Sequence, residues 1–202
     1  MIVIIDYNVG NLKSVEGAFF RVGMDVVVSR DKEVIKKADG IVLPGVGTFL
    51  TAMNNLKKYD LIDVLKDRKE AGIPILGICL GMQILFEEGY EVSKCDGLGF
   101  IPGKVEYMNI DEKIPHMGWN QLHLRKDSPI LKYLKENDDV YFVHSYMANC
   151  PKEYIVADSD YGSLYVTAIV QKDNVIGCQF HPEKSGAIGQ KILLAFKEVV
   201  EC

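Results

Sequence analysis

The sequence lacks most features that mark a secreted, membrane-bound or nucleic-acid-binding protein. Its five cysteines are odd in number, widely spread and never in CxxC spacing, which argues against a disulfide framework or a zinc site and favours a reducing cytoplasm. The first apolar run ends at Asp6 without a preceding basic segment, so we expect neither a signal peptide nor a membrane span. A net charge of -5, with no Lys/Arg cluster apart from acidic neighbours, gives no indication of nucleic-acid binding.

The composition is that of a globular protein with a sizeable core. The chain has 202 residues, of which 48% are hydrophobic, and it contains no repeat, low-complexity segment or linker. Its mean hydropathy of +0.05 is typical of a protein that folds in water. We therefore expect one domain over residues 1–202, and nothing in the sequence points to a metal or a cofactor.

The first half of the chain alternates short apolar runs with amphipathic stretches. Runs that are apolar at nearly every position predict parallel strands covered on both faces, at residues 2–5, 26–28, 40–43 and 75–78. Helical spacing predicts helices within residues 12–22, 31–37 and 53–65 and after Gly81. The carboxyl edge of such a sheet binds ligands, and it would carry the loops at residues 7–11, 44–48 and 79–81.

After Gly89 the pattern changes to short strands separated by tight turns. Strands are expected at residues 105–107, 121–124, 140–143, 165–171 and 175–180. They would be antiparallel and would continue or cover the first sheet, and a last helix spans about residues 187–200. The predicted fold is α/β, with a mostly parallel central sheet flanked by helices and antiparallel strands in the second half.

The segment at residues 73–86, IPILGICLGMQILF, predicts a strand, a tight turn and a helix. Cys79 lies between Gly77 and Gly81, which is the cysteine version of the G-x-S-x-G nucleophile elbow. A helix N-terminus beside Cys79 would favour the thiolate. Most lone cysteines are small buried hydrophobes, but the flanking glycines and the preceding apolar strand favour a nucleophile here.

A cysteine nucleophile needs a base and a group that orients the base. His181 follows an apolar strand and precedes Pro182, and Glu183 is two residues further on. In an extended segment, side chains at i and i+2 point the same way, so the carboxylate would reach the imidazole. The tripeptide His-Pro-Glu also occurs in solvated turns, but together with the cysteine elbow it predicts a Cys-His-Glu triad.

The other three histidines have weaker functional patterns. His123 alternates with leucines in an expected strand, which predicts an exposed position. His144 ends a strand and would either line a pocket or satisfy a buried hydrogen bond. His116 lies in PHMGWN at residues 115–120, which by composition is neither strand nor helix, and Trp119 there is either a wedge in the core or an anchor for a partner.

The loop PGVG at residues 44–47 matches neither a dinucleotide-binding nor a Walker pattern. Its position after an expected strand better suits a second N–H donor, beside the Leu80 amide, in an oxyanion hole.

These motifs together resemble those of the class I, triad-type glutamine amidotransferases. Within that family, the sequence is similar to the glutaminase subunits of imidazole glycerol phosphate synthase, an enzyme of histidine biosynthesis. The resemblance covers most of the chain and rests on DYNVGN at 6–11, PGVG at 44–47, the elbow, PHMGWN at 115–120, VHSY at 143–146 and QFHPEKS at 179–185.

The resemblance implies glutamine hydrolysis through a cysteine thioester, without a cofactor, and transfer of the ammonia to a (β/α)8-barrel cyclase. It implies a catalytic triad of Cys79, His181 and Glu183. The oxyanion donors would be Leu80, Val46 and Gly47, and the residues that hold glutamine would be Gly47, Gln83, His144, Ser145 and Tyr146. The partner would be contacted by Asn11, Trp119, Asn120 and Lys184.

Two other functions remain open from the sequence. One is a glutaminase that serves a different synthase, including a paralogue for nucleotide-sugar modification. The other is a non-catalytic binding subunit that retains the fold, although all three triad residues are present. A further expectation is that the flexible loop at 44–47 rearranges when the partner binds, which would leave the free chain nearly inactive.

Overall fold

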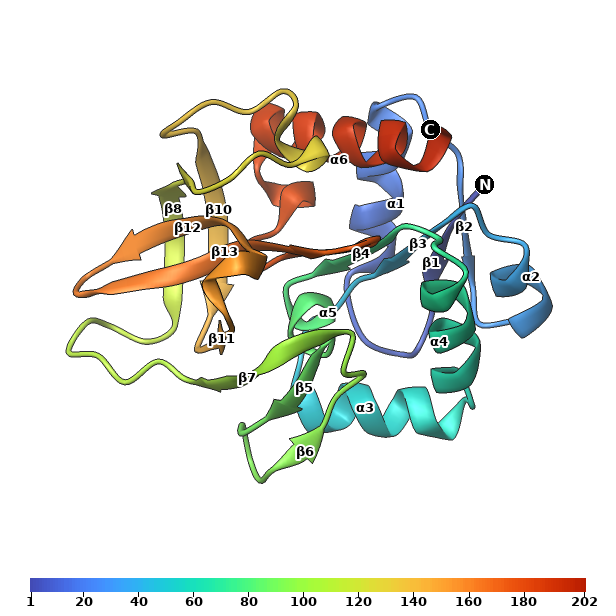
Figure 1. Cartoon of the computed structure of the whole chain (residues 1–202), viewed down its shortest axis with the longest axis horizontal. Coiled ribbons are helices and arrows are strands. Elements are labelled where there is room, and N and C mark those ends of the chain that lie inside the picture. The colour runs from blue at the N-terminus through green and yellow to red at the C-terminus, as the bar shows by residue number, and fades with distance from the viewer.

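The computed structural model describes residues 1–202, and an eight-stranded mixed sheet runs through its centre (Figure 1). The strand order is β2-β1-β3-β4-β14-β13-β12-β9. Four parallel strands are buried at every position and one edge strand, β2, is not, as expected for a sheet covered on both faces. These parallel strands are β1 (Ile2–Ile5), β2 (Val26–Ser29), β3 (Gly40–Leu43), β4 (Ile75–Ile78) and β14 (Val175–Cys178).

The later strands both extend and cover this sheet, as predicted. The expectation that all of them are antiparallel was wrong for the strand at 175–180, because β14 inserts beside β4 and runs parallel to it, and only its other edge has an antiparallel partner. β13 (Leu164–Lys172), β12 (Ile155–Tyr161) and β9 (His123–Leu124) continue it beyond β14. A two-stranded sheet pairs β10 (Asp139–His144) with β8 (His116–Gln121). A four-stranded sheet contains β11 (Tyr146–Asn149), β7 (Ile101–Tyr107), β5 (Phe86–Gly89) and β6 (Cys95–Asp96).

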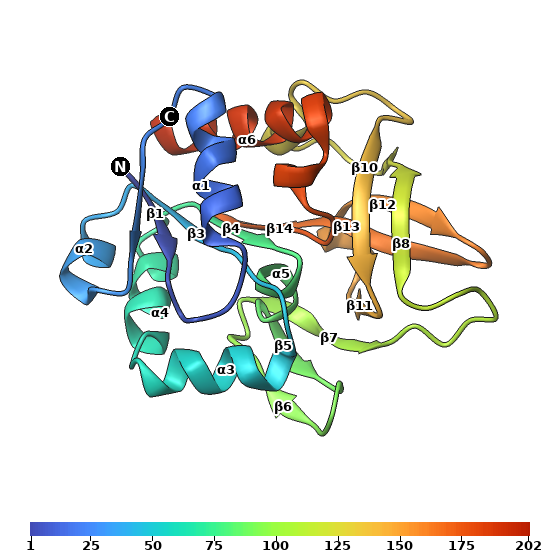
Figure 2. The same cartoon turned by 180° about the vertical axis from the view of Figure 1, so that it is seen from behind.

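Helices cover both faces of the central sheet, and each face has its own apolar core (Figures 1 and 2). α1 (Leu12–Arg21) and α6 (Gly186–Glu201) pack on one face. The other face is covered by α2 (Lys32–Lys36), α3 (Phe49–Lys58) and α4 (Ile62–Glu70). Successive residues of β1 contribute to opposite cores, which explains why the parallel strands are apolar at every position.

Two helix predictions were wrong in extent. The stretch expected as one helix over 53–65 is divided between α3 and α4, because Asp60 adopts a left-handed conformation (φ 54°) and turns the chain. The helix after Gly81 is only α5 (Leu80–Gln83), and the chain then enters β5, which was not predicted. The run from Met82 to Phe86 is buried throughout, and a continuous apolar run does not distinguish helix from strand.

The strand predictions also need correction in the second half. Residues 116–120, expected to be irregular, lie in β8 opposite β10, where exposed positions alternate with less exposed ones and only His116 is fully buried. The strand expected at 121–124 is divided between the end of β8 and β9, and the one expected at 175–180 ends at Cys178. β11 and β12 were missed, while β7 begins at Ile101 rather than at residue 105.

Candidate active site

Three neighbouring parallel strands end at the same edge of the sheet, and each leads into predicted site residues. β3 leads into the loop at residues 44–47, β4 into Cys79, and β14 into the segment that carries His181. β4 pairs with β3 on one side and with β14 on the other, so the cysteine lies between the loop and the histidine. The loop at 7–11, also expected here, packs against the loop at 44–47, with Gly10 close to the backbone of Gly45.

Cys79 occupies a strained turn between β4 and α5, as predicted for a nucleophile elbow. Its φ of 54° lies in the left-handed region, which a residue with a side chain rarely adopts. A Cβ at Gly77 would lie 2.6 Å from the Gly81 carbonyl oxygen, and a Cβ at Gly81 would lie 1.7 Å from that of Leu43. Both glycines are therefore required by close approach of the backbone.

The N–H groups expected to form an oxyanion hole are free in the structure. The amide of Leu80, at the start of α5, donates no hydrogen bond within the chain, and the same holds for the amides of Val46 and Gly47. The Tyr7 hydroxyl donates to the Pro44 carbonyl and holds the beginning of the loop. Gly47 has a φ of 118°, so the end of the loop depends on a conformation that glycine permits.

His181 and Glu183 form the expected contact, but by a different local geometry. Nδ1 of His181 is 2.7 Å from Oε1 of Glu183. The segment Pro182–Lys184 is a 3-10 turn, so the prediction of an extended backbone was wrong and the turn itself brings the carboxylate back to the ring. The backbone of His181 is held by Tyr141 and by the hydroxyl of Ser185.

The protonation of His181 depends on both of its neighbours in the predicted triad. Burial opposes protonation, but the contacts with Cys79 and Glu183 outweigh it and raise the pKa of His181 to about 9. Nε2 of the ring has no hydrogen-bond partner within the chain. His181 lines the same cavity as Cys79, and the contact with Cys79 that raises its pKa places the ring beside the sulfur.

A cavity of about 300 Å³ opens beside the cysteine, at the lower end of the size range for small-molecule sites. Every residue predicted to bind glutamine contributes to its lining, as do the predicted oxyanion residues. The sequence analysis did not identify Glu91, Pro115 and Val143, which also line it. Glu91 lies between β5 and β6, where no local pattern distinguishes it from other exposed acidic residues. The lining residues predicted from the sequence are Val46, Gly47, Cys79, Leu80, Gln83, His144, Ser145, Tyr146 and His181.

His144 both lines the cavity and makes buried hydrogen bonds, so both roles considered from the sequence apply to it. Its Nδ1 is 2.8 Å from the Tyr146 carbonyl oxygen, and its Nε2 is 3.0 Å from Nδ1 of His116. Burial lowers the pKa of His144 to about 3. A neutral ring therefore supports the strand end that carries Ser145 and Tyr146.

The residues expected to contact a partner are only partly brought together. Trp119 is 55% exposed, which excludes the core wedge. Its ring meets the Tyr141 ring edge-on at 5.9 Å, and Nζ of Lys184 lies 5.9 Å from the same Tyr141 ring. Asn120 is anchored by its amide to the Asp160 carbonyl, and Asn11 precedes α1, the helix that packs against the turn carrying Lys184.

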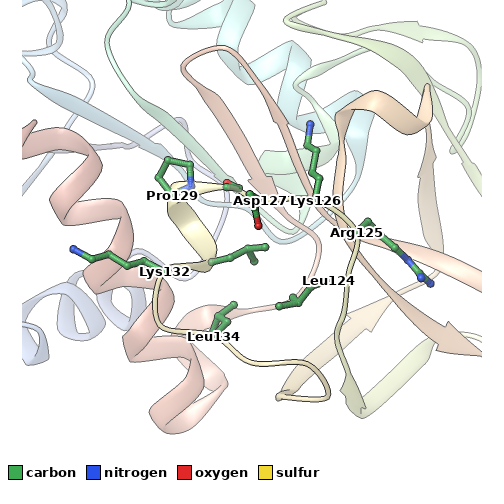
Figure 3. Close-up of a pocket in the computed structure, with 9 residues that line it drawn as sticks. Leu124, Arg125, Lys126, Asp127, Pro129, Lys132 and Leu134 are labelled. Atoms are coloured by element: carbon green, nitrogen blue, oxygen red, sulfur yellow. The ribbon is translucent and has the colours of Figure 1, made fainter.

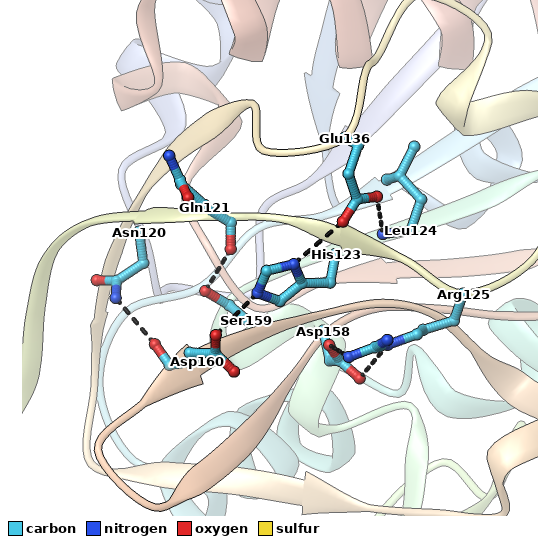
Figure 4. A network of polar contacts seen from close by, with 9 residues as sticks. All are labelled: Asn120, Gln121, His123, Leu124, Arg125, Glu136, Asp158, Ser159 and Asp160. Atoms are coloured by element: carbon cyan, nitrogen blue, oxygen red, sulfur yellow. Dashed lines mark hydrogen bonds and ion pairs between the residues drawn. The ribbon is translucent and has the colours of Figure 1, made fainter.

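His123 is half-buried and bonded, so the prediction of an exposed strand position was wrong. Its Nδ1 is 3.1 Å from Glu136 and its Nε2 is 2.9 Å from Asp160 (Figure 4). Beside it, Arg125 and Asp158 form a two-pronged ion pair with both distances at 2.7 Å. This network joins β9 to β12 and lies outside the cavity beside Cys79.

A larger hollow of about 640 Å³ lies along residues 124–134, away from the three strand ends (Figure 3). Two of its cationic groups are paired with carboxylates, Arg125 with Asp158 and Lys132 with Glu198, and the third, Lys126, donates to the Glu153 carbonyl. No group of three or more His, Cys, Asp or Glu side chains is arranged to hold a metal ion. No helix has the length and apolar character needed to cross a bilayer.

The open α/β sheet combines a strained cysteine turn, a His–Glu pair and free backbone N–H groups, which is the arrangement that an amide hydrolase with a cysteine nucleophile requires. The sequence matches the family "Glutamine amidotransferase class-I" over residues 3–200. The chain belongs to this family of glutamine amidotransferases.

Full-length relatives agree with this assignment, and a solved structure agrees with the fold. The chain is 61% identical to imidazole glycerol phosphate synthase subunit HisH of Lactococcus lactis subsp. lactis (strain IL1403), covering 98% of each chain. It is 50% identical to the subunit of the same name from Bacillus cereus (strain G9842), over 100% of this chain and 96% of that one. A solved glutamine amidotransferase structure aligns over 100% of both chains with a TM-score of 0.79 at 20% identity, which confirms the predicted fold.

Proposed function

We propose that this chain is the glutaminase subunit of imidazole glycerol phosphate synthase, the function that the sequence motifs predict. It hydrolyses glutamine to glutamate and passes the ammonia to a cyclase subunit in histidine biosynthesis. The observation that supports the proposal is the meeting of three strand ends, where the loop at 44–47, Cys79 and His181 border one cavity and Glu183 contacts His181. The full-length relatives named for this subunit support the choice among glutamine amidotransferases.

The reaction proceeds in two steps at Cys79. The thiolate attacks the side-chain amide carbon of glutamine, and the oxyanion that forms accepts hydrogen bonds from the free amides of Leu80 and of the loop at Val46 and Gly47. One such donor is typically worth about 3 kcal/mol of barrier. His181 gives its Nε2 proton to the departing ammonia, then takes a proton from the water that hydrolyses the glutamyl thioester.

The cavity supplies groups that match the amino-acid end of glutamine. Oε1 of Gln83 receives no hydrogen bond from the chain, because both contacts of its amide use Nε2. It is free to accept an N–H of the substrate. Glu91 lines the cavity, and its carboxylate, which also accepts from the Phe49 N–H, suits the α-ammonium group. Ser145 and Tyr146 line the same space.

A (β/α)8-barrel cyclase is the partner that we propose, docked against the surface that carries Trp119 and Lys184. The five free cysteines suit a reducing cytoplasm, and the family match over residues 3–200 supports a single domain. Because Gly47 can change conformation cheaply, docking would set the oxyanion loop and raise the glutaminase rate.

The test is glutamine hydrolysis by the purified chain, with and without a barrel cyclase from the same source and its nucleotide ligand. Strong activation that disappears in Cys79→Ala supports both the triad and the partner. If the hydrolysis rate is the same with and without the cyclase, the proposed triad stands, but the partner must be a different synthase. No hydrolysis under any condition, and no labelling of Cys79 by a glutamine-analogue electrophile, would favour a non-catalytic subunit.

A further inference from the structure

A chain of side-chain amides joins the wall of the cavity to the sulfur of Cys79. Nε2 of Gln83 donates to the Tyr146 carbonyl oxygen at 3.1 Å and to Oε1 of Gln179 at 3.0 Å. Nε2 of Gln179 then lies 3.7 Å from the Cys79 sulfur. Gln179 has no exposed surface, so water does not compete for its amide.

The direction of both amides is determined by the carbonyl at the start of this chain. A backbone carbonyl only accepts, so the end of Gln83 that faces Tyr146 must be its NH₂ group. That same nitrogen faces Gln179, which must therefore present its oxygen to Gln83. The remaining end of Gln179, its NH₂ group, consequently points at the Cys79 sulfur.

An N–H donor at this position distinguishes between the two protonation states of the cysteine. A thiolate accepts a charge-assisted hydrogen bond from Gln179, whereas a thiol accepts only weakly. The thiol has a different partner, because the Cys79 sulfur lies 3.9 Å from the Val143 carbonyl oxygen, an acceptor for S–H. Both contacts are present in the structure, and loss of the proton removes the reason for the first while it strengthens the second. The titratable group that faces the sulfur is His181, whose pKa the contact with Cys79 raises, so the Gln179 donor acts on the thiolate in addition to this imidazole.

We propose that Gln179 stabilises the Cys79 thiolate through its side-chain N–H, and that Gln83 holds this donor in place from the glutamine-binding wall. The inference rests on the proposed role of Cys79 as nucleophile. It gives Gln83 a second role besides binding substrate, because its amide orients the group that touches the sulfur. It also links the Tyr146 strand end to the reactivity of the cysteine.

The experiment measures the pH dependence of Cys79 alkylation by iodoacetamide in the full chain, with the modified peptides quantified by mass spectrometry. The variants are Gln179→Met, which keeps the shape and removes the donor, Gln179→Glu, which places an acceptor there, and Gln83→Met, which frees Gln179 to turn. Gln190→Met, at an exposed position on α6, is the matched control. The exposed Cys202 is the internal reference in each sample.

We expect Gln179→Met to lower the Cys79 alkylation rate at neutral pH about tenfold and to move its pH midpoint up by about one unit. Gln179→Glu should show a larger loss and Gln83→Met a smaller one, while Gln190→Met and the Cys202 rate stay unchanged. Thermal unfolding is recorded for each variant, since a merely structural role would lower stability without moving the pH midpoint.

An unmoved midpoint in Gln179→Met, in a folded chain with a reactive Cys79, would overturn this inference and leave the glutaminase proposal intact. If Gln179→Met does not fold, the comparison of Gln83→Met with Gln190→Met decides instead, and equal midpoints there overturn it. Cys79 that reacts no faster than Cys202 at neutral pH in the unmodified chain would overturn the nucleophile role and the inference together.

Discussion

Nδ1 of His181 lies 2.7 Å from Oε1 of Glu183, and both side chains are only 2% exposed. The carboxylate accepts, so Nδ1 of the ring carries a hydrogen, and Nε2 is buried with no hydrogen-bond partner within the chain. A histidine that acts as general acid and base requires this arrangement, in which a carboxylate holds one ring nitrogen and the other nitrogen gives and takes the proton.

Replacing Glu183 with Gln should therefore lower glutaminase kcat by roughly 10²–10⁴ with little change in KM, as loss of the orienting carboxylate does in serine triads. The substitution also removes a negative charge that raises the pKa of His181. The alkaline limb of the pH–rate profile, where the imidazolium is lost, should move to lower pH. Initial rates of glutamate formation across pH test both effects, and a loss below tenfold would contradict the role given to Glu183.

Gly81 and Gly17 should respond in opposite ways to the same substitution. In Gly81→Ala the new Cβ would lie 1.7 Å from the Leu43 carbonyl oxygen, so the elbow cannot form without moving the β3 backbone. We expect a loss of at least about 3 kcal/mol in unfolding free energy, or no folded protein. Gly17 lies inside α1 with only an ordinary contact to Arg21, so Gly17→Ala should stabilise the chain by about 0.5–1 kcal/mol. Chemical denaturation of both variants provides the comparison.

Local sequence predicted the parts of the site that follow the parallel strands. The apolar runs before Cys79 and His181 identified β4 and β14, and the spacing of Gly77, Cys79 and Gly81 encodes the elbow within five residues. Such features depend on neighbouring residues alone. The carboxyl ends of adjacent parallel strands then meet at one edge by the geometry of the sheet.

Other parts of the site depend on contacts between distant segments. Glu91 lines the cavity because its carboxylate accepts from the Phe49 N–H at the start of α3 (2.6 Å), a pairing that no local pattern records. Residues 116–120 become β8 only by pairing with β10, despite a glycine at φ 146° in their midst. The contact of Gln179 with the sulfur likewise appears only when β14 lies beside β4.

His123 should contribute stability that depends on pH. Its hydrogen bonds to Glu136 and Asp160 raise its pKa in the folded chain above the ordinary value of 6.5 (Figure 4). The stabilisation is therefore fully present below pH 6.5 and is lost as pH rises through the folded pKa. The pKa of Glu136 is lowered by the Leu124 N–H and by His123, so its own contribution is present above about pH 4.5 and is lost as pH falls.

The His123→Gln variant tests this pH window. It should be less stable than the unmodified chain by about 0.5–1 kcal/mol at pH 6, the size of a partly exposed ion pair, and the difference should shrink towards pH 9. Denaturant unfolding at both pH values measures it. A difference that is equal at the two pH values would mean that packing, rather than charge, accounts for the role of His123.

Trp119 should matter for association with the cyclase and not for folding. Its ring is 55% exposed on β8 and meets Tyr141 edge-on, so it is held in place yet open to a partner. Exposed tryptophans of this kind are frequent hot spots, and Trp119→Ala should raise the Kd for the cyclase tenfold or more while leaving the thermal unfolding midpoint unchanged. Phe20→Ala is the matched control, since Phe20 is 71% exposed but lies on α1, away from β8 (Figure 2). Titration calorimetry with the cyclase compares the two, and equal Kd values would place the docking surface elsewhere.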